Sequence, residues 1–187
     1  FGTHDTYIAE GKGKVKAVGN VMSKGGLQGY LIDKKTADRL KIKSVMDIKK
    51  HAKEFDSNND GKADMVACPP GWGCEKQITK HFAELGLGDF INPVQADYSA
   101  SMADAIAKYK NGKSILVYTW TPNWTVGALE LGKDIVWIEV PYSETKSVKV
   151  SNATKSKINM GFNADDIRAA ANVDFLKANP RVEKMLK

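Results

Sequence analysis

A short cysteine-bracketed loop, CPPGWGC at 68–74, carries the residues best suited to chemistry. It holds both cysteines of the chain, and Trp72 lies between two glycines. The spacing is not that of a C-x-x-C redox motif, and a zinc site would need further Cys or His nearby, so a disulfide between Cys68 and Cys74 is favoured. That bond indicates an oxidising compartment and would restrict the conformations open to Trp72.

An aromatic face beside free backbone amides suits a ligand with a cation at one end and an anion at the other. Aromatic faces attract quaternary ammonium groups. The amides of Gly73 and Cys74, at the start of an expected helix, could bind a carboxylate. Trp120 follows a predicted strand in the same way. Core packing is the competing interpretation for Trp72 and Trp120, and it is the favoured one for Trp124 and Trp137.

A second candidate site is the segment DSNNDGKAD at 56–64, which resembles a calcium loop. Oxygen-bearing side chains alternate along it, and a glycine stands at the sharp turn. The ligands would be Asp56, Asn58, Asp60, the backbone oxygen of Lys62, and Asp64. Ala67 stands where the bidentate glutamate should be, and a surface turn rich in Asp and Asn is the competing interpretation. Any calcium would be structural, and no cofactor is required.

Strand and helix patterns alternate around these motifs. Apolar runs predict strands at 29–34, 63–68, 91–96, 114–118 and 134–141. Helices are predicted from Thr36, after a Ser44 N-cap, from Cys74 to a Gly86 C-cap, from Ser99, from Pro122, and at 174–187 with a break at Pro180. Segment 143–159 is polar and predicts a surface loop. This alternation indicates an α/β domain with a mainly parallel sheet, in which Trp72 and Trp120 share the edge where ligands bind.

The composition is that of a soluble globular protein, with 42% hydrophobic and 27% charged residues among 187. The net charge of +6 comes from scattered lysines, which favours a solvated basic surface over nucleic-acid binding. His51 and His81 fall in helix patterns and are expected at the surface or partly packed. No cluster of nucleophile, base and acid is present, so an enzyme is not predicted. The opening FGTHDTY suggests a processed or truncated chain.

Three segments, in order, resemble a known family: QGYLIDKKTADRLKI, FDSNNDGKADMVACPPGWGCE and ILVYTWTPNW. They are similar to periplasmic glycine betaine-binding proteins of ProU-type ABC importers, and the similarity runs from about His4 to about Pro180. It implies a two-lobed periplasmic binding protein fold. One complete lobe would span 28–160, and parts of the other lobe would span 1–27 and 161–187.

The resemblance also implies roles for single residues. Trp72 and Trp120 match two walls of the family's box of three tryptophans, and the third would lie upstream of Phe1. The amides of Gly73 and Cys74, together with His4, match the groups that hold the ligand carboxylate. Cys68 and Cys74 match the family's disulfide.

The implied function is the substrate-binding component of an ABC importer. The ligand would be glycine betaine or a similar quaternary ammonium or sulfonium osmolyte. The physiological role of the importer would be osmoprotection. The partners would be a membrane permease and its ATPase, with no nucleic acid, and the protein would be a monomer. The location would be the periplasm, or a membrane tether outside a Gram-positive cell. The alternative is a calcium-stabilised extracellular α/β module that binds a different small zwitterion.

Overall fold

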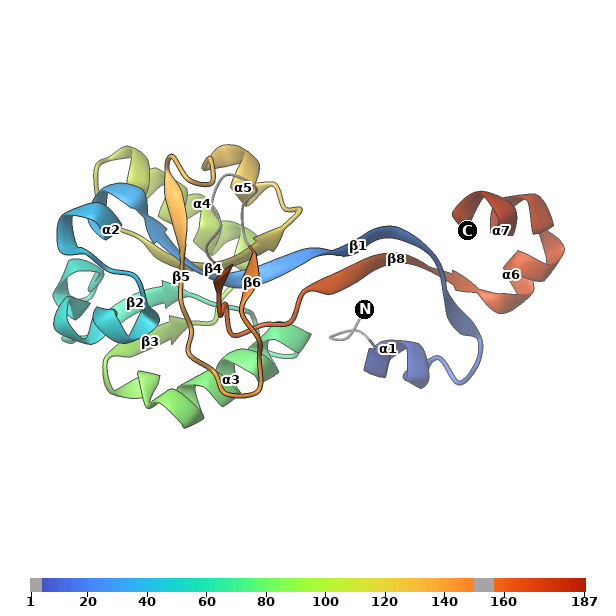
Figure 1. Cartoon of the computed structure of the whole chain (residues 1–187), viewed down its shortest axis with the longest axis horizontal. Helices are drawn as coiled ribbons and strands as arrows, with labels where there is room; N and C mark the ends of the chain where they lie inside the picture. The colour runs from blue at the N-terminus through green and yellow to red at the C-terminus, as the bar shows by residue number, and fades with distance from the viewer. Residues whose placement is uncertain (1–4, 150–156) are drawn as a thin grey trace. The chain divides into compact units, whose positions relative to one another are not determined.

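The computed structural model describes residues 5–149 and 157–187, so His4 lies outside the described residues. The chain forms two compact units, one of residues 1–27 and 164–187 and the other of residues 28–163. The chain enters the larger unit along strand β1 (Val15–Asp33) and leaves it just before β8 (Asp165–Asn172) (Figure 1). The sequence pattern predicted only the last part of β1.

The larger unit is an α/β domain, as predicted. Its main sheet contains the end of β1, β2 (Ala63–Val66), β3 (Ile91–Val94), β4 (Leu116–Thr121) and β5 (Ile135–Ile138). They lie in the order β3-β2-β4-β1-β5. Strand β2 runs parallel to β3 and to β4, whereas β5 is antiparallel to β1. The parallel strands point their carboxyl ends to one edge, where the loops that follow them meet.

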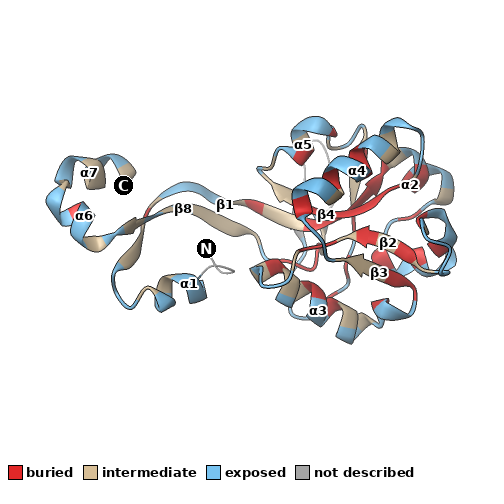
Figure 2. Cartoon of the chain, turned by 180° about the vertical axis from the view of Figure 1, so that it is seen from behind, coloured by how far each residue is buried: buried red, intermediate tan, exposed pale blue. Residues whose placement is uncertain are grey.

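Helices surround this sheet, and the strands between them are largely buried (Figure 2). The α-helices are α2 (Lys34–Leu40), α3 (Gly73–Leu85), α4 (Tyr98–Lys110) and α5 (Thr125–Ala128). The described residues of this unit also form the 3-10 helices η2 (Val45–Lys50), η3 (Ala52–Glu54) and η4 (Leu87–Asp89). Fully buried side chains such as Leu31, Ile32, Met65 and Leu116 form the core from neighbouring strands.

Local capping signals set most of the helix starts and ends. Ser44 caps η2, as predicted, although the segment is 3-10 rather than α-helical. Asp47 completes a capping box with it. Gly86 ends α3 in the left-handed conformation, as predicted. Helix α4 starts at Tyr98 because the Asp97 side chain caps it, one residue before the predicted start. Helix α5 starts at Thr125, so the predicted start at Pro122 was wrong.

The smaller unit pairs the first part of β1 with β8 in an antiparallel ribbon, from Val15 opposite Asn172 to Gly26 opposite Asp165. It also contains α1 (Asp5–Glu10), α6 (Val173–Ala178) and α7 (Pro180–Leu186). The predicted break at Pro180 is confirmed. Lys16 on β1 forms an ion pair of 2.9 Å with Glu183 on α7.

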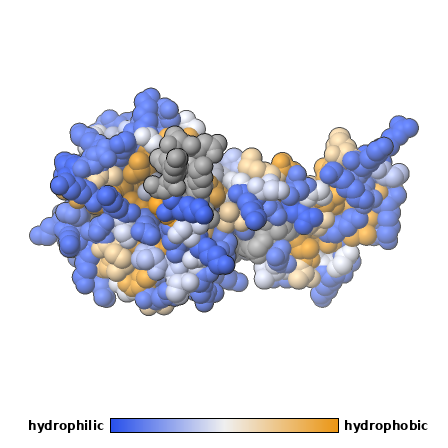
Figure 3. Space-filling model, viewed as in Figure 1, coloured by the Kyte–Doolittle hydropathy of each residue, from blue (hydrophilic) through white to orange (hydrophobic). Residues whose placement is uncertain are grey.

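The predicted surface loop at 143–159 contains a short antiparallel pair, β6 (Val148–Lys149) with β7 (Lys157–Ile158). Over residues 5–149 and 157–187, no helix is both long and apolar enough to cross a bilayer. Figure 3 shows hydrophilic residues over much of the visible face of the larger unit, in keeping with the scattered lysines.

Candidate ligand-binding site

The cysteine loop is closed by a disulfide between Cys68 and Cys74, with the two Cα atoms 6.1 Å apart. This confirms the predicted disulfide. Both cysteines are buried, whereas Trp72 between them is 42% exposed. Trp72 is the N-cap residue of α3, with an extended backbone that directs the chain into the helix. The loop therefore presents an indole at the surface from a covalently restricted turn.

Gly73 and Cys74 are the first two residues of α3, a helix of 13 residues. The first amides of a helix have no carbonyl partner within the helix, and the helix dipole gives this end partial positive charge. The next amide, Glu75 N, donates to the carbonyl of the N-cap residue Trp72 at 3.1 Å. An anion bound here would lie beside the exposed indole of Trp72.

Three aromatic rings gather where β2, β3 and β4 end. The ring centroids of Trp72 and Trp120 are 6.1 Å apart, with the planes at 68°. Tyr98 lies near both, 5.8 Å from Trp72 and 5.1 Å from Trp120. The structure thus brings together the two tryptophans that the sequence singled out. We call Trp72, Tyr98 and Trp120 the aromatic cluster.

Tyr98 is the member of the cluster that sequence reasoning missed. It is only 4% exposed, and its hydroxyl donates to Thr119 Oγ1 at 2.9 Å. Burial raises the pKa of Tyr98, against hydrogen bonds with Thr119, Thr125 and Asn123 that lower it. The available signal was its position: like Trp72, it follows a strand and lies at the start of a helix.

The other two tryptophans differ from each other. Trp137 on β5 is half-buried and packs against the core, as predicted. Trp124 is 51% exposed at the N-cap of α5, so the core-packing interpretation was wrong for it. Trp124 lies on a short turn of helix whose buried residue is Thr125, which leaves the indole on the outside.

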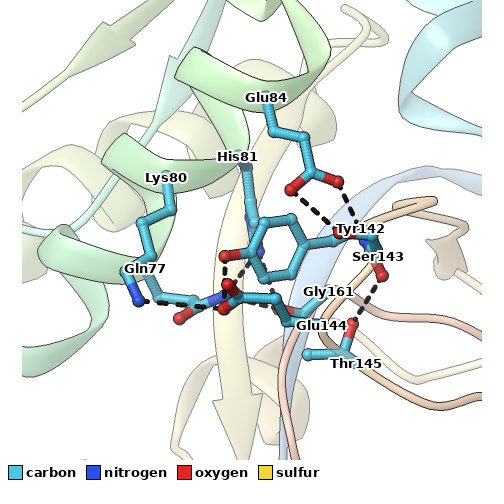
Figure 4. A network of polar contacts seen from close by, with 9 residues as sticks. All are labelled: Gln77, Lys80, His81, Glu84, Tyr142, Ser143, Glu144, Thr145 and Gly161. Carbon is cyan, nitrogen blue, oxygen red and sulfur yellow. Dashed lines mark hydrogen bonds and ion pairs between the residues drawn. The ribbon is translucent and has the colours of Figure 1, made fainter.

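The histidines also need a correction. His51 is half-buried, in keeping with the prediction, but His81 is fully buried, so the prediction of a surface or partly packed position was wrong for it. Tyr30 Oη donates to His81 Nδ1 at 2.8 Å. His81 Nε2 donates to the carbonyl of Gly161 at 2.7 Å (Figure 4). Burial lowers the pKa of His81 to about 4, although the bond to Gly161 and the charge of Glu84 raise it.

The predicted calcium loop at 56–64 has its oxygens engaged within the protein. The Asp56 carboxylate accepts from the amides of Asn58, Asn59, Asp60 and Gly61. Asp64 accepts from Ser57 and Asn92, and the Asn58 amide donates to Asp60. Lys62 donates its amide to Asp60.

Within the part of the chain that the structure describes, no group of three or more His, Cys, Asp or Glu side chains could hold a metal ion. The calcium prediction for Asp56, Asn58, Asp60, Lys62 and Asp64 therefore has no support. The arrangement is that of the competing interpretation, a surface turn held by its own Asp and Asn side chains.

The fold defines the class of protein: an α/β domain with three aromatic side chains gathered at the carboxyl ends of its parallel strands. A family model described as the substrate binding domain of the ABC-type glycine betaine transport system (OpuAC) matches residues 1–187. The chain belongs to this family. Since the family consists of transport proteins that bind substrates, the prediction that the chain is not an enzyme is confirmed.

Two curated relatives are named as glycine betaine-binding periplasmic proteins. The glycine betaine-binding periplasmic protein OusX of Dickeya dadantii is 43% identical over 185 residues, which are 97% of this chain and 56% of the relative. The glycine betaine/proline betaine-binding periplasmic protein of Escherichia coli K12 is 42% identical over 186 residues, with the same coverage. The chain thus spans about half the length of the curated relatives it matches.

Solved structures share the fold at low sequence identity. The Borrelia burgdorferi glycine betaine/L-proline-binding protein ProX has a TM-score of 0.64 at 16% identity, covering 96% of this chain and 56% of that one. Lactococcal OpuAC, in its closed form with glycine betaine, has a TM-score of 0.57 at 17% identity, covering 98% and 59%. These likenesses confirm the periplasmic binding protein fold, of which this chain covers roughly half.

Proposed function

We propose that the chain is the substrate-binding part of an ABC importer for glycine betaine or a similar quaternary ammonium or sulfonium osmolyte. The observation that carries the proposal is the pair of indoles of Trp72 and Trp120, 6.1 Å apart, beside the first amides of α3. The ammonium group would lie against the indole faces. The carboxylate would accept from the amides of Gly73 and Cys74, with His4 as a further donor.

The roles of the units follow from the same proposal. Residues 28–163 would form one complete lobe, whereas 1–27 and 164–187 would belong to the second lobe of a two-lobed binding protein. A membrane permease with its ATPase would receive the ligand from a monomeric binding protein. The periplasmic names of the relatives and the disulfide both support a location outside the cytoplasm.

The affinity of this chain is expected to be weak. Micromolar binding requires about 8 kcal/mol, and two cation–π contacts supply roughly 1–2 kcal/mol each. The carboxylate contacts add to this, but a third aromatic wall would be needed for tight binding. We therefore expect a dissociation constant of roughly millimolar order for the chain alone.

A titration with glycine betaine tests the proposal. The trimethyl proton signal of betaine, followed by NMR, reports binding without relying on the tryptophans. We expect saturable binding that is lost in Trp72→Ala and in Trp120→Ala. The matched control is Trp124→Ala, which removes another exposed indole outside the aromatic cluster. Glycine and proline, which lack the trimethylammonium group, should not compete.

Choline distinguishes binding of the ammonium group from binding of the carboxylate, because it has the ammonium group but no carboxylate. His4→Ala should weaken betaine binding and leave choline binding unchanged. Equal losses with Trp124→Ala and Trp72→Ala would contradict the indole pair as the cation site. An absence of any betaine binding at concentrations of about 100 mM would contradict the proposed ligand.

A further inference from the structure

Tyr98 contacts both tryptophans from the core side. Its ring centroid is 5.8 Å from that of Trp72 and 5.1 Å from that of Trp120, with both pairs of planes at 36°. Trp72 is 42% exposed and Trp120 is half-buried, whereas Tyr98 is 4% exposed. Tyr98 therefore lies beneath the two indoles, with almost no surface of its own left for a ligand.

The hydroxyl of Tyr98 is held by a buried chain of polar groups. It donates to Thr119 Oγ1 at 2.9 Å and lies 3.2 Å from the carbonyl of Tyr118. Thr119 Oγ1 and Thr125 Oγ1 are 2.6 Å apart, and both threonines are fully buried. Trp120 lies in the chain between these two threonines. The hydroxyl chain thus ties Tyr98 to both sides of the turn that presents Trp120.

Contacts of this kind restrict side-chain orientation. Tilted aromatic pairs at these distances contribute about 0.5–1.5 kcal/mol each beyond burial. A buried hydroxyl left without its partner is costly, so the chain from Tyr98 to Thr125 favours one arrangement of the turn. The disulfide restricts Trp72 through its backbone, but no covalent bond restrains Trp120 in the same way.

We propose that Tyr98 is a positioning residue that sets the distance and orientation of Trp72 and Trp120, and through them the affinity for a quaternary ammonium or sulfonium cation. The ring holds the two indoles, and the hydroxyl holds the turn after β4. The predicted effect of Tyr98 on cation affinity rests on the proposed function. The predicted effect of Tyr98 on the positions of the two indoles does not.

Two variants and a matched control test this role. Tyr98→Phe keeps the ring and removes the hydroxyl, and Tyr98→Leu removes both. Tyr109→Phe is the control: Tyr109 is also on α4, and its hydroxyl donates to Asp134 Oδ1 at 2.9 Å. The indole N–H signals of Trp72 and Trp120 are followed by NMR without ligand, and the betaine dissociation constant is then measured by titration.

We expect Tyr98→Phe to shift the Trp120 indole signal and to weaken betaine binding by up to about tenfold, the value of one hydrogen bond. Tyr98→Leu should shift both indole signals and weaken binding further, because both ring pairs are lost. Tyr109→Phe should change neither signal nor affinity. If Tyr98→Leu fails to fold, Tyr98→Phe still decides the question.

Two results would overturn the proposal. If Tyr98→Phe has the same indole signals and the same betaine affinity as the unaltered chain and as Tyr109→Phe, Tyr98 is an ordinary core residue. A weakened affinity with unchanged ligand-free indole signals would make Tyr98 a direct ligand contact instead. If the unaltered chain binds no betaine, the proposed function fails, but the ligand-free indole signals still decide whether Tyr98 positions the tryptophans.

Discussion

His81 Nε2 donates to the carbonyl of Gly161 at 2.7 Å, across 80 residues of sequence. His81 is on α3, the helix that Trp72 caps, and Gly161 lies two residues before the chain leaves the larger unit. The Gln77 side-chain amide also donates to Gly161 O, at 3.2 Å. The bond therefore fixes the last segment of the larger unit to the helix that begins at the candidate ligand site (Figure 4).

This buried histidine makes the protein sensitive to acid. The pKa of His81 is about 4 in the folded state, against about 6.5 in an unfolded chain. Between these values the unfolded state binds more protons, so stability is complete above about pH 6.5 and falls as the pH drops toward 4. The loss could reach about 3 kcal/mol, at about 1.4 kcal/mol per pKa unit.

Urea unfolding at several pH values measures this effect. His81→Gln should flatten the change in unfolding free energy between about pH 6.5 and 4. His51→Gln, at a half-buried histidine outside the network, is the control and should keep the wild-type slope. The same slope in His81→Gln and wild type would contradict His81 as the source of this acid response.

Gly161→Ala should destabilise the larger unit. The backbone of Gly161 has a φ of +75°, and an added Cβ would lie 2.7 Å from His81 Cε1 and from Val140 Cγ1. Left-handed strain and overpacking together should cost about 3 kcal/mol of unfolding free energy.

Gly132→Ala is the matched control for this change. Gly132 has a φ of +84°, but an added Cβ would meet no atom within 4 Å. It should cost only the backbone strain, about 1–2 kcal/mol. Denaturant midpoints of the two variants give the comparison, and equal losses would contradict the predicted clash with His81.

Reduction of the disulfide should destabilise the protein and loosen Trp72. Cys68 and Cys74 are six residues apart, and closing a loop this short contributes about 2–3 kcal/mol in the chain-entropy model. Dithiothreitol should therefore lower the denaturant midpoint and reduce the fluorescence anisotropy of Trp72. The Cys68→Ser/Cys74→Ser double variant should show the lower midpoint without reductant and should not respond to it.

The loop at 56–64 should stabilise the protein without calcium. Desolvation raises the pKa of Asp56, but hydrogen bonds from the amides of Gly61, Asn59, Asn58 and Asp60 together outweigh it, so the pKa is lowered. Asp56→Ala removes these acceptors and should lower the melting temperature equally in calcium and in EGTA. A melting temperature of the unaltered protein that rises with calcium would contradict this prediction.

The sequence alone determined the elements that carry the site. Trp72 and Trp120 could be assigned to the same edge of the sheet because each comes after an apolar run, and parallel strands share one carboxyl edge. The structure corrects one detail, since Trp120 lies within β4 rather than after it. The Ser44 and Gly86 caps and the break at Pro180 were predictable because they depend on residues within a few positions of each other.

The tertiary structure decided the partners that lie far apart in sequence. Tyr98 joins the tryptophans only because β3 lies next to β2 in the sheet, and strand order depends on long-range packing. His81 follows Ile78 by three residues on the buried face of α3. From the sequence, a polar residue at this position is expected at the surface. In the structure it is buried, because Tyr30 and Gly161 provide its hydrogen-bond partners.

The first part of β1 shows the same limit. Residues 15–28 contain glycines and lysines without an alternating apolar pattern, so no strand was predicted there. They form a strand because β8, about 150 residues further along the chain, supplies the backbone hydrogen bonds. Local pattern determined where elements begin and end, and non-local hydrogen bonds and packing decided which of them meet.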